Sequence, residues 1–428
     1  MSPSYRVLLV SDSYAPLIGG ADTAVRLLAL ELSKRGHDMQ VATAWQRGLP
    51  ASERLDGIQV HRLRDSSSRV PWVSEDPYKH HPPPYPDPEA VLRFRRLLAR
   101  VRPDVVHSYG WLTYSCRAAI TGLSVPLVLS VRDWGNFCAL RTLLQYGERP
   151  CSGPEPGKCL DCAGRHYGHA KGAVAVAGVL GGRSWLAERV DAAHFNSAFT
   201  HRVAWQHLFS GRAAFAPGSA ADAVIPNFLP DQDSDESDAG ILARLPEDPY
   251  ILFVGAFRRV KGIEQLLAAY RGLPDPPPLV LIGTRESDTP ETFPPEVTVL
   301  ESVPRGTVLA AWRRALFGVS PSTVGETFGN VVHEAMSQGR PVIGTRPSGH
   351  EELILDRETG FLVPRDDVGS LAEAMHALIR DSALRERMGA AARERAALFS
   401  AEHAAPRFEA LYQTAIATSR SAMAPRGR

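Results

Sequence analysis

The chain has 428 residues, of which 44% are hydrophobic and 22% charged, so it is long enough for two or more domains and too apolar for bulk disorder. Its 48 basic and 47 acidic residues leave a net charge of +1, which argues against a nucleic-acid partner. The apolar run at residues 7–10 is too short for a signal peptide, and the stretch 172–180 is too short to cross a bilayer. We therefore expect a cytoplasmic protein.

Short apolar runs alternate with helical patterns in the first half of the chain. Strands are predicted at residues 7–10, 39–43, 60–63, 105–107, 127–130 and 192–195. Gly19 and Gly20 lie in a loop after the first strand, ahead of a predicted helix that ends at Gly36. This alternation is typical of a parallel sheet covered on both faces. Residues 66–88 interrupt it with a Pro-, His- and Tyr-rich loop of a length that is usually functional or mobile.

A break follows residues 225–228, and the alternation then restarts. We interpret the acidic, Ser-rich run at residues 231–238 as a solvated linker, although it contains Asp-x-Asp spacings that would otherwise indicate a metal site. Strands are predicted at residues 251–255, 280–283, 318–320 and 342–344, and helices at 263–270 and 330–337. The amphipathic stretch 400–417 is expected to pack back on the first domain.

The pattern predicts an α/β protein with two doubly wound, Rossmann-like domains. The first would span residues 1–228 together with a C-terminal helix at about 400–420, and the second would span residues 229–399. Ligands of such sheets bind beyond the carboxyl ends of the strands, so two domains that face each other would share one cleft.

The segment Glu326–Glu334 carries the strongest functional signal in the chain. It places two glutamates around a Phe-Gly turn that leads into a predicted helix. The first amides of such a helix point at whatever lies before it, and the helix dipole favours an anion there. Glu334 lies about one turn inside the helix, within reach of a diol, and Glu326 lies in the loop on the other side of the anion. This order is typical of a sugar-nucleotide site.

These residues match a known family, because the chain resembles the retaining glycosyltransferases of family 4 (GT4, also called group 1), which have the two-domain GT-B fold. The likeness covers nearly the whole chain, and its marks fall in the family's order. They are residues 16–20, 35–37, 103–107, 225–227, 255–262, 326–334 and 359–363. The paired-glutamate segment is highly specific, whereas the other marks are individually weak.

The resemblance implies a role for each matching residue. Glu334 would accept hydrogen bonds from the donor ribose, and Glu326 would contact hydroxyls of the donor sugar. Lys261 would neutralise the leaving diphosphate, and Gly19 and Gly20 would bring backbone close to the donor phosphates or the sugar. The amide-rich turn before the helix would consist of Phe328, Gly329, Asn330 and Val331.

The chemistry of sugar transfer explains why cations are needed. Negative charge builds on the departing diphosphate, and fixed cations and amide dipoles aimed at it are usually the largest catalytic term, about 3–4 kcal/mol per donor. No metal or other cofactor is required for catalysis if Lys and Arg do this work. The family usually has Arg at the position of Ala256, and here Arg258 or Arg259 would replace it, with Arg258 favoured by its position.

A second departure concerns the sugar side. The family often has a histidine after the strand at residues 127–130, where this chain has Arg132. Arginine is always charged and cannot act as a base near neutral pH, so either Arg132 contacts the donor differently or Asp133 has taken a polar role. His107 ends a predicted strand, and a structural role and an acceptor-side role are both open. The Arg-rich stretch 93–102 indicates a surface helix, with peripheral attraction to anionic lipid as the alternative.

Cys138, Cys151, Cys159 and Cys162 fall within one short segment that is rich in Gly and Pro. In a cytosolic chain such a cluster favours a structural zinc site over disulfides. Disulfide or redox pairing and unligated thiols stay open as alternatives, because the spacing is not that of a standard finger.

The sequence therefore predicts a retaining glycosyltransferase that moves a sugar from a nucleoside-diphosphate sugar to an acceptor hydroxyl. The base, the sugar and the acceptor are not specified by any motif. An epimerase or a phosphorylase of the same fold is disfavoured by the order of the motifs and the paired glutamates. A degenerate, non-catalytic sugar-nucleotide-binding protein is the alternative of a different class, motivated by Ala256 and Arg132.

Overall fold

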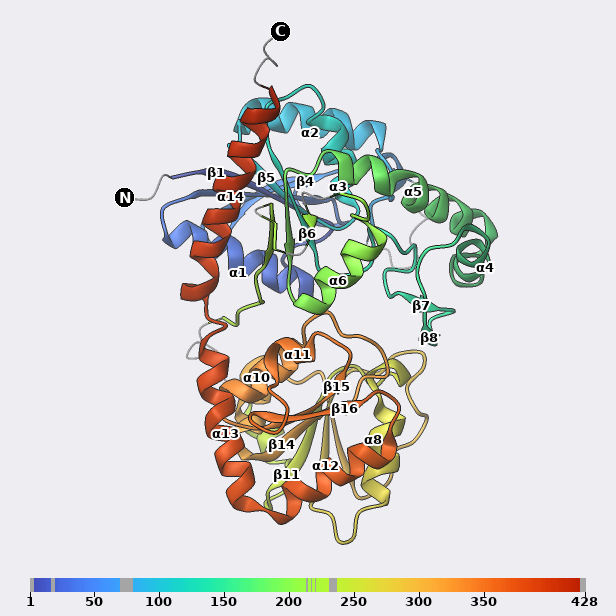
Figure 1. Ribbon diagram of the computed structural model, residues 1–428, viewed down its shortest axis with the longest axis vertical. Helices are drawn as coiled ribbons and strands as arrows, with labels where there is room; N and C mark the ends of the chain where they lie inside the picture. Colours follow the sequence, from blue (N-terminus) through green and yellow to red (C-terminus); the bar gives the residue numbers. More distant parts are fainter. Residues whose placement is uncertain are drawn as a thin grey trace. The chain divides into compact units, whose positions relative to one another are not determined.

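The computed structural model of the chain describes residues 4–16, 20–69, 80–212, 215–216, 218–219, 221–230 and 237–423. The chain forms two compact units, one of Met1–Ile225 with Ala401–Arg428 and one of Pro226–Ser400 (Figure 1). The boundary between the units follows Ile225 rather than Phe228. The last helix belongs to the first unit, although it follows the second unit in the sequence.

An eight-stranded sheet forms the centre of the first unit, in the order β10-β9-β6-β5-β1-β2-β4-β3. Its strands are β1 (Arg6–Ser11), β2 (Asp38–Ala44), β3 (Ser52–Leu55), β4 (Ile58–Leu63), β5 (Val105–Tyr109), β6 (Leu127–Val131), β9 (Ala192–Phe195) and β10 (Asp222–Val224). Every strand predicted in this half is confirmed. Among the described strands of this sheet, β3 alone pairs antiparallel, with β4, and neither β3 nor β10 was predicted. A separate antiparallel pair, β7 (Leu144–Gln145) and β8 (Arg149–Pro150), was not predicted either.

Helices cover this sheet because their apolar faces need burial. They are α1 (Gly20–Lys34), α2 (Pro88–Val101), α3 (Leu112–Ala119), α4 (Pro156–Tyr167), α5 (His169–Glu188), α6 (Ala198–His207) and α14 (Ala401–Met423). The Arg-rich stretch forms α2, whose amino end is capped by Asp87. Its residues Ala90, Phe94, Leu97, Leu98 and Val101 are buried, whereas Leu92 is exposed. Helix α14 contacts α1 and the strands β5, β6, β9 and β10, as expected for a helix that packs back on this unit (Figure 1).

The second unit contains a six-stranded, fully parallel sheet in the order β13-β12-β11-β14-β15-β16. Its strands are β11 (Tyr250–Val254), β12 (Leu279–Gly283), β13 (Val297–Glu301), β14 (Ala315–Ser320), β15 (Val342–Arg346) and β16 (Gly360–Pro364). Its helices are α7 (Ala239–Leu242), α8 (Ile263–Arg271), α9 (Arg305–Arg314), α10 (Asn330–Ser337), α11 (His350–Leu353), α12 (Val368–Arg380) and α13 (Ser382–Ala397). The predicted strands and both predicted helices are confirmed, and β13 and β16 were not predicted.

The strand orders locate where a ligand would bind in each unit. In the second unit the order reverses between β11 and β14, so the loops after Val254 and Ser320 begin at the switch point. In the first unit it reverses between β1 and β5, which places the residues after Ser11 and Tyr109 at the corresponding position. Among the described helices, none combines the length and apolarity that crossing a bilayer requires.

Candidate active site

The loop after β11 brings Lys261 to the loop after β14. Gly262 has φ +77°, and a Cβ atom there would lie 2.0 Å from the Pro321 carbonyl oxygen, so only glycine permits this close approach of the two loops. Lys261 Nζ donates to Glu326 Oε1 at 2.7 Å, and the Ser322 hydroxyl donates to the same oxygen at 2.6 Å. Two predicted site residues, separated in the sequence, thus form one ion pair.

The charge state of Glu326 is fixed by this pair. Burial alone would raise the pKa of Glu326, but the charges of Lys261 and His350 and the hydrogen bonds from Lys261 and Ser322 lower it to about 2. Burial lowers the pKa of His350 to about 4, against the attraction of Glu326. At neutral pH Glu326 is therefore a carboxylate and His350 a neutral imidazole.

Helix α10 begins at the predicted turn. Gly329 is its N-cap residue with φ +109°, and a Cβ atom there would lie 2.8 Å from His350 Cδ2. Phe328 is buried and anchors the turn in the core, so its part in the site comes from its backbone. As a glycine, the N-cap residue has no side chain with which to cap the amino end of α10. Its first amides are therefore suited to an external anion, as the motif predicts.

Glu334 lies on α10, and its partner comes from a different helix. Its Oε1 accepts a hydrogen bond from Arg305 Nε at 3.3 Å, and its side chain is 15% exposed. Asn330, at the start of α10, accepts a hydrogen bond from Asn227 Nδ2 at 2.8 Å. The paired-glutamate motif predicted Glu334 as a site residue. Nothing near Glu334 in the sequence indicates that Arg305 or Asn227 would lie at this helix.

The two arginines that follow Ala256 differ in their surroundings. Arg258 Nε lies 3.0 Å from Asp288 Oδ1, and its side chain is 37% exposed. Arg259 pairs with Glu264 on the adjoining helix, and its side chain is 70% exposed. The geometry therefore offers Arg258 as the less exposed of the two. Gly20 is the first residue of α1, and Gly19 lies outside the described residues.

In the first unit, His107 is part of a buried network. His107 Nε2 lies 2.7 Å from Ser130 Oγ, and its Nδ1 lies 2.9 Å from the Tyr412 hydroxyl of α14. Ser130 Oγ also lies 2.5 Å from His194 Nδ1. Burial, with the nearby charges of His194 and Arg132, lowers the pKa of His107 well below its ordinary value. These contacts favour the structural interpretation of His107.

Asp133, one of the predicted sugar-side residues, belongs to a charged cluster with Asp12 and Arg141, which were not predicted. Arg141 donates to Asp12 Oδ2 at 2.7 Å and to Asp133 Oδ2 at 2.6 Å. Burial disfavours the charge on Arg141, but Asp133 and Asp12 raise its pKa above the ordinary value. Arg132 Cζ lies 5.8 Å from the centre of the Tyr109 ring. Asp12 follows β1 and Asp133 follows β6, so the cluster lies at the carboxyl edge of the sheet.

Comparison with known proteins identifies the family. The model described as glycosyl transferases group 1 matches residues 235–395, and the model described as glycosyltransferase family 4 matches residues 18–203. The chain belongs to the family 4 glycosyltransferases. The predicted family is thereby confirmed, and so is the GT-B fold.

Curated relatives align with most of this glycosyltransferase. A D-inositol 3-phosphate glycosyltransferase of Arthrobacter sp. (strain FB24) is 28% identical, over 87% of this chain and 85% of the relative. A glycogen synthase of Mycobacterium tuberculosis is 26% identical, over 91% of this chain and 90% of the relative.

Solved structures share the fold. A sucrose-phosphate synthase from Thermosynechococcus elongatus superposes with a TM-score of 0.70 at 21% identity, over 96% of this chain and 99% of that chain. HepE of Anabaena, in complex with UDP-glucose, gives a TM-score of 0.62 at 16% identity, over 98% of this chain and 100% of that chain.

The cysteine segment does not present a metal site. Among the described residues, which include all five cysteines, no three or more His, Cys, Asp or Glu side chains are placed to hold a metal ion. Cys162 is buried and accepts from the Tyr146 amide at 3.1 Å, whereas Cys159 accepts from the Glu155 amide at 3.3 Å. All five thiols are free. The predicted zinc therefore lacks a ligand set in this arrangement, and it stays a prediction for metal analysis of the untagged protein.

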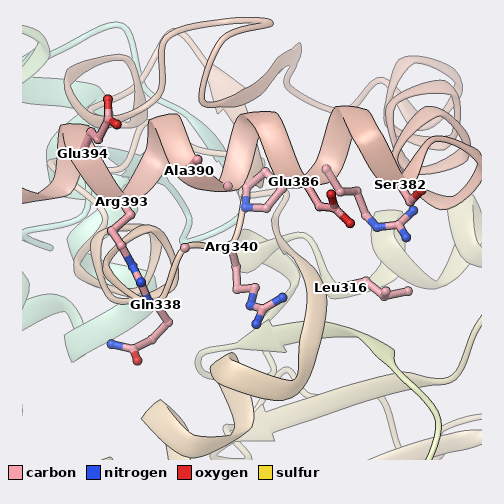
Figure 2. Close-up of a pocket in the computed structure, with 12 residues that line it drawn as sticks. Leu316, Gln338, Arg340, Ser382, Glu386, Ala390, Arg393 and Glu394 are labelled. Atoms are coloured by element: carbon pink, nitrogen blue, oxygen red, sulfur yellow. The ribbon is translucent and has the colours of Figure 1, made fainter.

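A cavity of about 600 Å³ lies elsewhere in the second unit. Its walls are the segment that joins α10 to β15 and one face of α13, and Figure 2 shows Gln338, Arg340 and Arg393 among the side chains that line it. Leu316 and Pro341 line it near the first residues of β14 and β15, so it lies at the amino edge of the sheet. It shares no residue with the predicted donor site.

Proposed function

We propose that this glycosyltransferase moves a hexose from a nucleoside-diphosphate sugar to an acceptor hydroxyl with retention of the anomeric configuration. The observation that carries the proposal is the amino end of α10, whose N-cap glycine has no capping side chain and which lies in the chain between Glu326, the partner of Lys261, and Glu334. An anion on those amides would have a cation on one side and a ribose acceptor on the other. Solved neighbours in complex with UDP, UDP-glucose or ADP support a nucleoside-diphosphate-sugar donor.

The proposed roles follow from charge and position. Lys261 would bind the β-phosphate and stabilise its charge as the glycosidic bond breaks, because a fixed cation costs no reorganisation in the transition state. Glu326 would hold donor-sugar hydroxyls, since its lowered pKa keeps it a hydrogen-bond acceptor at neutral pH. Glu334 would accept from the ribose hydroxyls. The leaving diphosphate requires no metal in this scheme.

Donor turnover tests the proposal. UDP-, ADP- and GDP-sugars would first be screened by thermal shift, because a ligand of the folded state raises the melting temperature. The donor that stabilises most would then be incubated without acceptor, and slow release of nucleoside diphosphate is expected. Proton NMR of a product formed with added polyols would give the anomeric configuration. Stabilisation without any turnover, with or without acceptor, would contradict a transferase at this site.

A further inference from the structure

The cysteine segment builds a second cavity in the first unit. The cavity has a volume of about 540 Å³ and lies between this segment, the end of α5 and the end of α6. Its walls are Ser152, Gly153, Pro154, Glu155, Lys158, Arg183, Ser184, Gln206, His207, Leu208 and Ser210. None of these residues belongs to the proposed transfer site or to the Asp12–Arg141–Asp133 cluster. The residues are polar apart from Gly153, Pro154 and Leu208.

Positive charge dominates these walls. Lys158, Arg183 and His207 face the single carboxylate of Glu155. That carboxylate lies 3.7 Å from Lys158 Nζ, yet its side chain is 70% exposed whereas that of Lys158 is 17% exposed. Within the part of the chain that the structure describes, neither Arg183 nor His207 forms an ion pair. Lys158 and Arg183 thus bring two cations to the cavity against one carboxylate, and Arg183 forms no ion pair with any described residue.

The imidazole ring of His207 is held in a fixed position at the cavity wall. A Cβ atom on Gly153 would lie 2.4 Å from His207 Cε1, so the loop backbone is pressed against the imidazole ring. The ring of Phe137 packs on it with ring centres 5.4 Å apart. Burial, followed by the charges of Arg183 and Lys158, lowers the pKa of His207. An anion between these groups would relieve that repulsion.

The rest of the lining suits oxygen-rich ligands. The serine hydroxyls and the Gln206 amide can donate to phosphate oxygens and accept from hydroxyl groups. The amino end of α4 begins at this wall, and no side chain caps it. Its dipole adds to the positive potential of the cavity. The small number of apolar walls disfavours a lipid chain.

We propose that this cavity binds the phosphate group of a small, soluble, phosphorylated polyhydroxy compound, at a site separate from the transfer chemistry. Arg183 and Lys158 would bind the phosphate oxygens as charged donors, and His207 would donate from the ring nitrogen. The serines and Gln206 would contact the hydroxyl groups of the ligand. The inference stands on the cavity and its charges, so it does not depend on which donor sugar the enzyme uses.

Phosphate titrations of the full chain test the site. Inorganic phosphate, added at constant ionic strength against chloride, should raise the melting temperature of the wild-type protein, and a hexose monophosphate should bind more tightly than phosphate alone. Arg183→Gln should weaken phosphate binding about tenfold or more, because a charged hydrogen bond is lost. Arg183→Lys should restore part of the affinity. The matched control is Arg165→Gln on α4, whose partner is Asp161 and whose side chain is 64% exposed.

A second control separates this cavity from the proposed donor site, which would also attract phosphate. Lys261→Ala should leave intact the part of the phosphate response that Arg183→Gln removes. If Lys261→Ala removes the response and Arg183→Gln keeps it, the ion binds in the donor site, and the cavity proposal is wrong while the proposed function stands. An equal loss in Arg165→Gln, or no phosphate response in the wild type, would overturn the cavity proposal.

Folding and the source of the phosphate have their own controls. Circular dichroism and the melting temperature without phosphate show whether Arg183→Gln folds, and Lys158→Gln and His207→Gln carry the test if it does not.

Vesicles with phosphatidic acid should not bind the wild-type protein through this cavity. Vesicle binding that Arg183→Gln abolishes, without any response to hexose monophosphate, would overturn the assignment to a soluble ligand.

Discussion

Lys261 Nζ lies 2.7 Å from Glu326 Oε1, although 65 residues separate the two in the sequence. The contact joins the loop after β11 to the loop after β14, the two strands at the switch point of the second unit. Each residue is proposed to bind a different part of the donor, so the pair fixes both side chains before the donor arrives. Such preorganisation is what makes a fixed cation effective in a transition state.

The Lys261–Glu326 pair should make stability depend on pH. The pKa of Glu326 is lowered to about 2 from 4.5, so its stabilisation is complete well above pH 4.5 and is lost as the pH falls toward 2. Between pH 7 and pH 4, the wild type should lose about 1 kcal/mol more unfolding free energy than Glu326→Gln. Urea denaturation at both pH values measures this. Glu373→Gln, at an exposed position, is the control, and parallel profiles for the wild type and Glu326→Gln would refute the pair's contribution.

Glu334 is expected to set the affinity for the nucleotide. Glu334→Ala should weaken the binding of nucleoside diphosphate and raise the donor KM, since losing a hydrogen bond to a charged group costs about 1.5–3 kcal/mol. The fold should stay intact, with a modest loss of stability because the hydrogen bond from Arg305 to Glu334 is removed. Titration calorimetry with the nucleoside diphosphate gives the affinity, and Glu373→Ala is the matched control. Unchanged affinity in Glu334→Ala would contradict the placement of the ribose.

The buried histidine network should contribute to stability rather than to turnover. Tyr412→Phe removes the hydroxyl that lies 2.9 Å from His107 Nδ1, and the Tyr109 hydroxyl lies at 3.3 Å as a partial replacement. We expect the unfolding free energy to fall by about 0.5–1.5 kcal/mol, the net value of one hydrogen bond, with kcat unchanged. Urea denaturation and donor turnover measure the two effects, with Tyr85→Phe as an exposed control. A large loss of kcat at unchanged stability would instead favour the acceptor-side role of His107.

The sequence predicted the parts of this protein that are encoded locally. The helix at residues 330–337 has the predicted bounds, because a glycine turn precedes it and its apolar spacing is regular. Strand β3 was missed because its four residues, Ser-Glu-Arg-Leu, include only one apolar side chain, at the antiparallel edge of the sheet. Strands β13 and β16 were not predicted, because no helical pattern was recognised in the segments before them to indicate that a further strand follows.

Site residues that belong to one motif could be predicted from the sequence. Residues that join the site from distant parts of the chain could not. Glu326 and Glu334 were found from one segment, whereas their neighbours His350 and Arg305 come from other loops and helices. Arg141 was missed for a similar reason, because its pairing with Asp12 spans 129 residues. Contacts of that kind are set by strand order, which a single sequence does not reveal.

The arginine that replaces the one missing at Ala256 can be identified by single substitutions. Arg258 is the less exposed candidate and pairs with Asp288, whereas Arg259 pairs with Glu264 near the surface. Because the charge of the leaving diphosphate rises as the glycosidic bond breaks, loss of a cation that faces it should lower kcat by about 10²–10³-fold, with a smaller effect on donor binding. We expect this for Arg258→Ala and for Lys261→Ala. Arg259→Ala should raise the activation free energy by only about 0–1 kcal/mol, the usual contribution of an isolated surface charge.

Steady-state kinetics with the best donor decide between the two arginines. The Asp288→Asn variant is a further control, since it frees Arg258 from its ion pair without removing the cation. If Arg258 turns toward the diphosphate during the reaction, Asp288→Asn should retain most of kcat. A larger loss in Arg259→Ala than in Arg258→Ala would reverse the assignment. Near-normal kcat in both arginine variants, together with a strong loss in Lys261→Ala, would mean that Lys261 and the amides of α10 suffice for the leaving group.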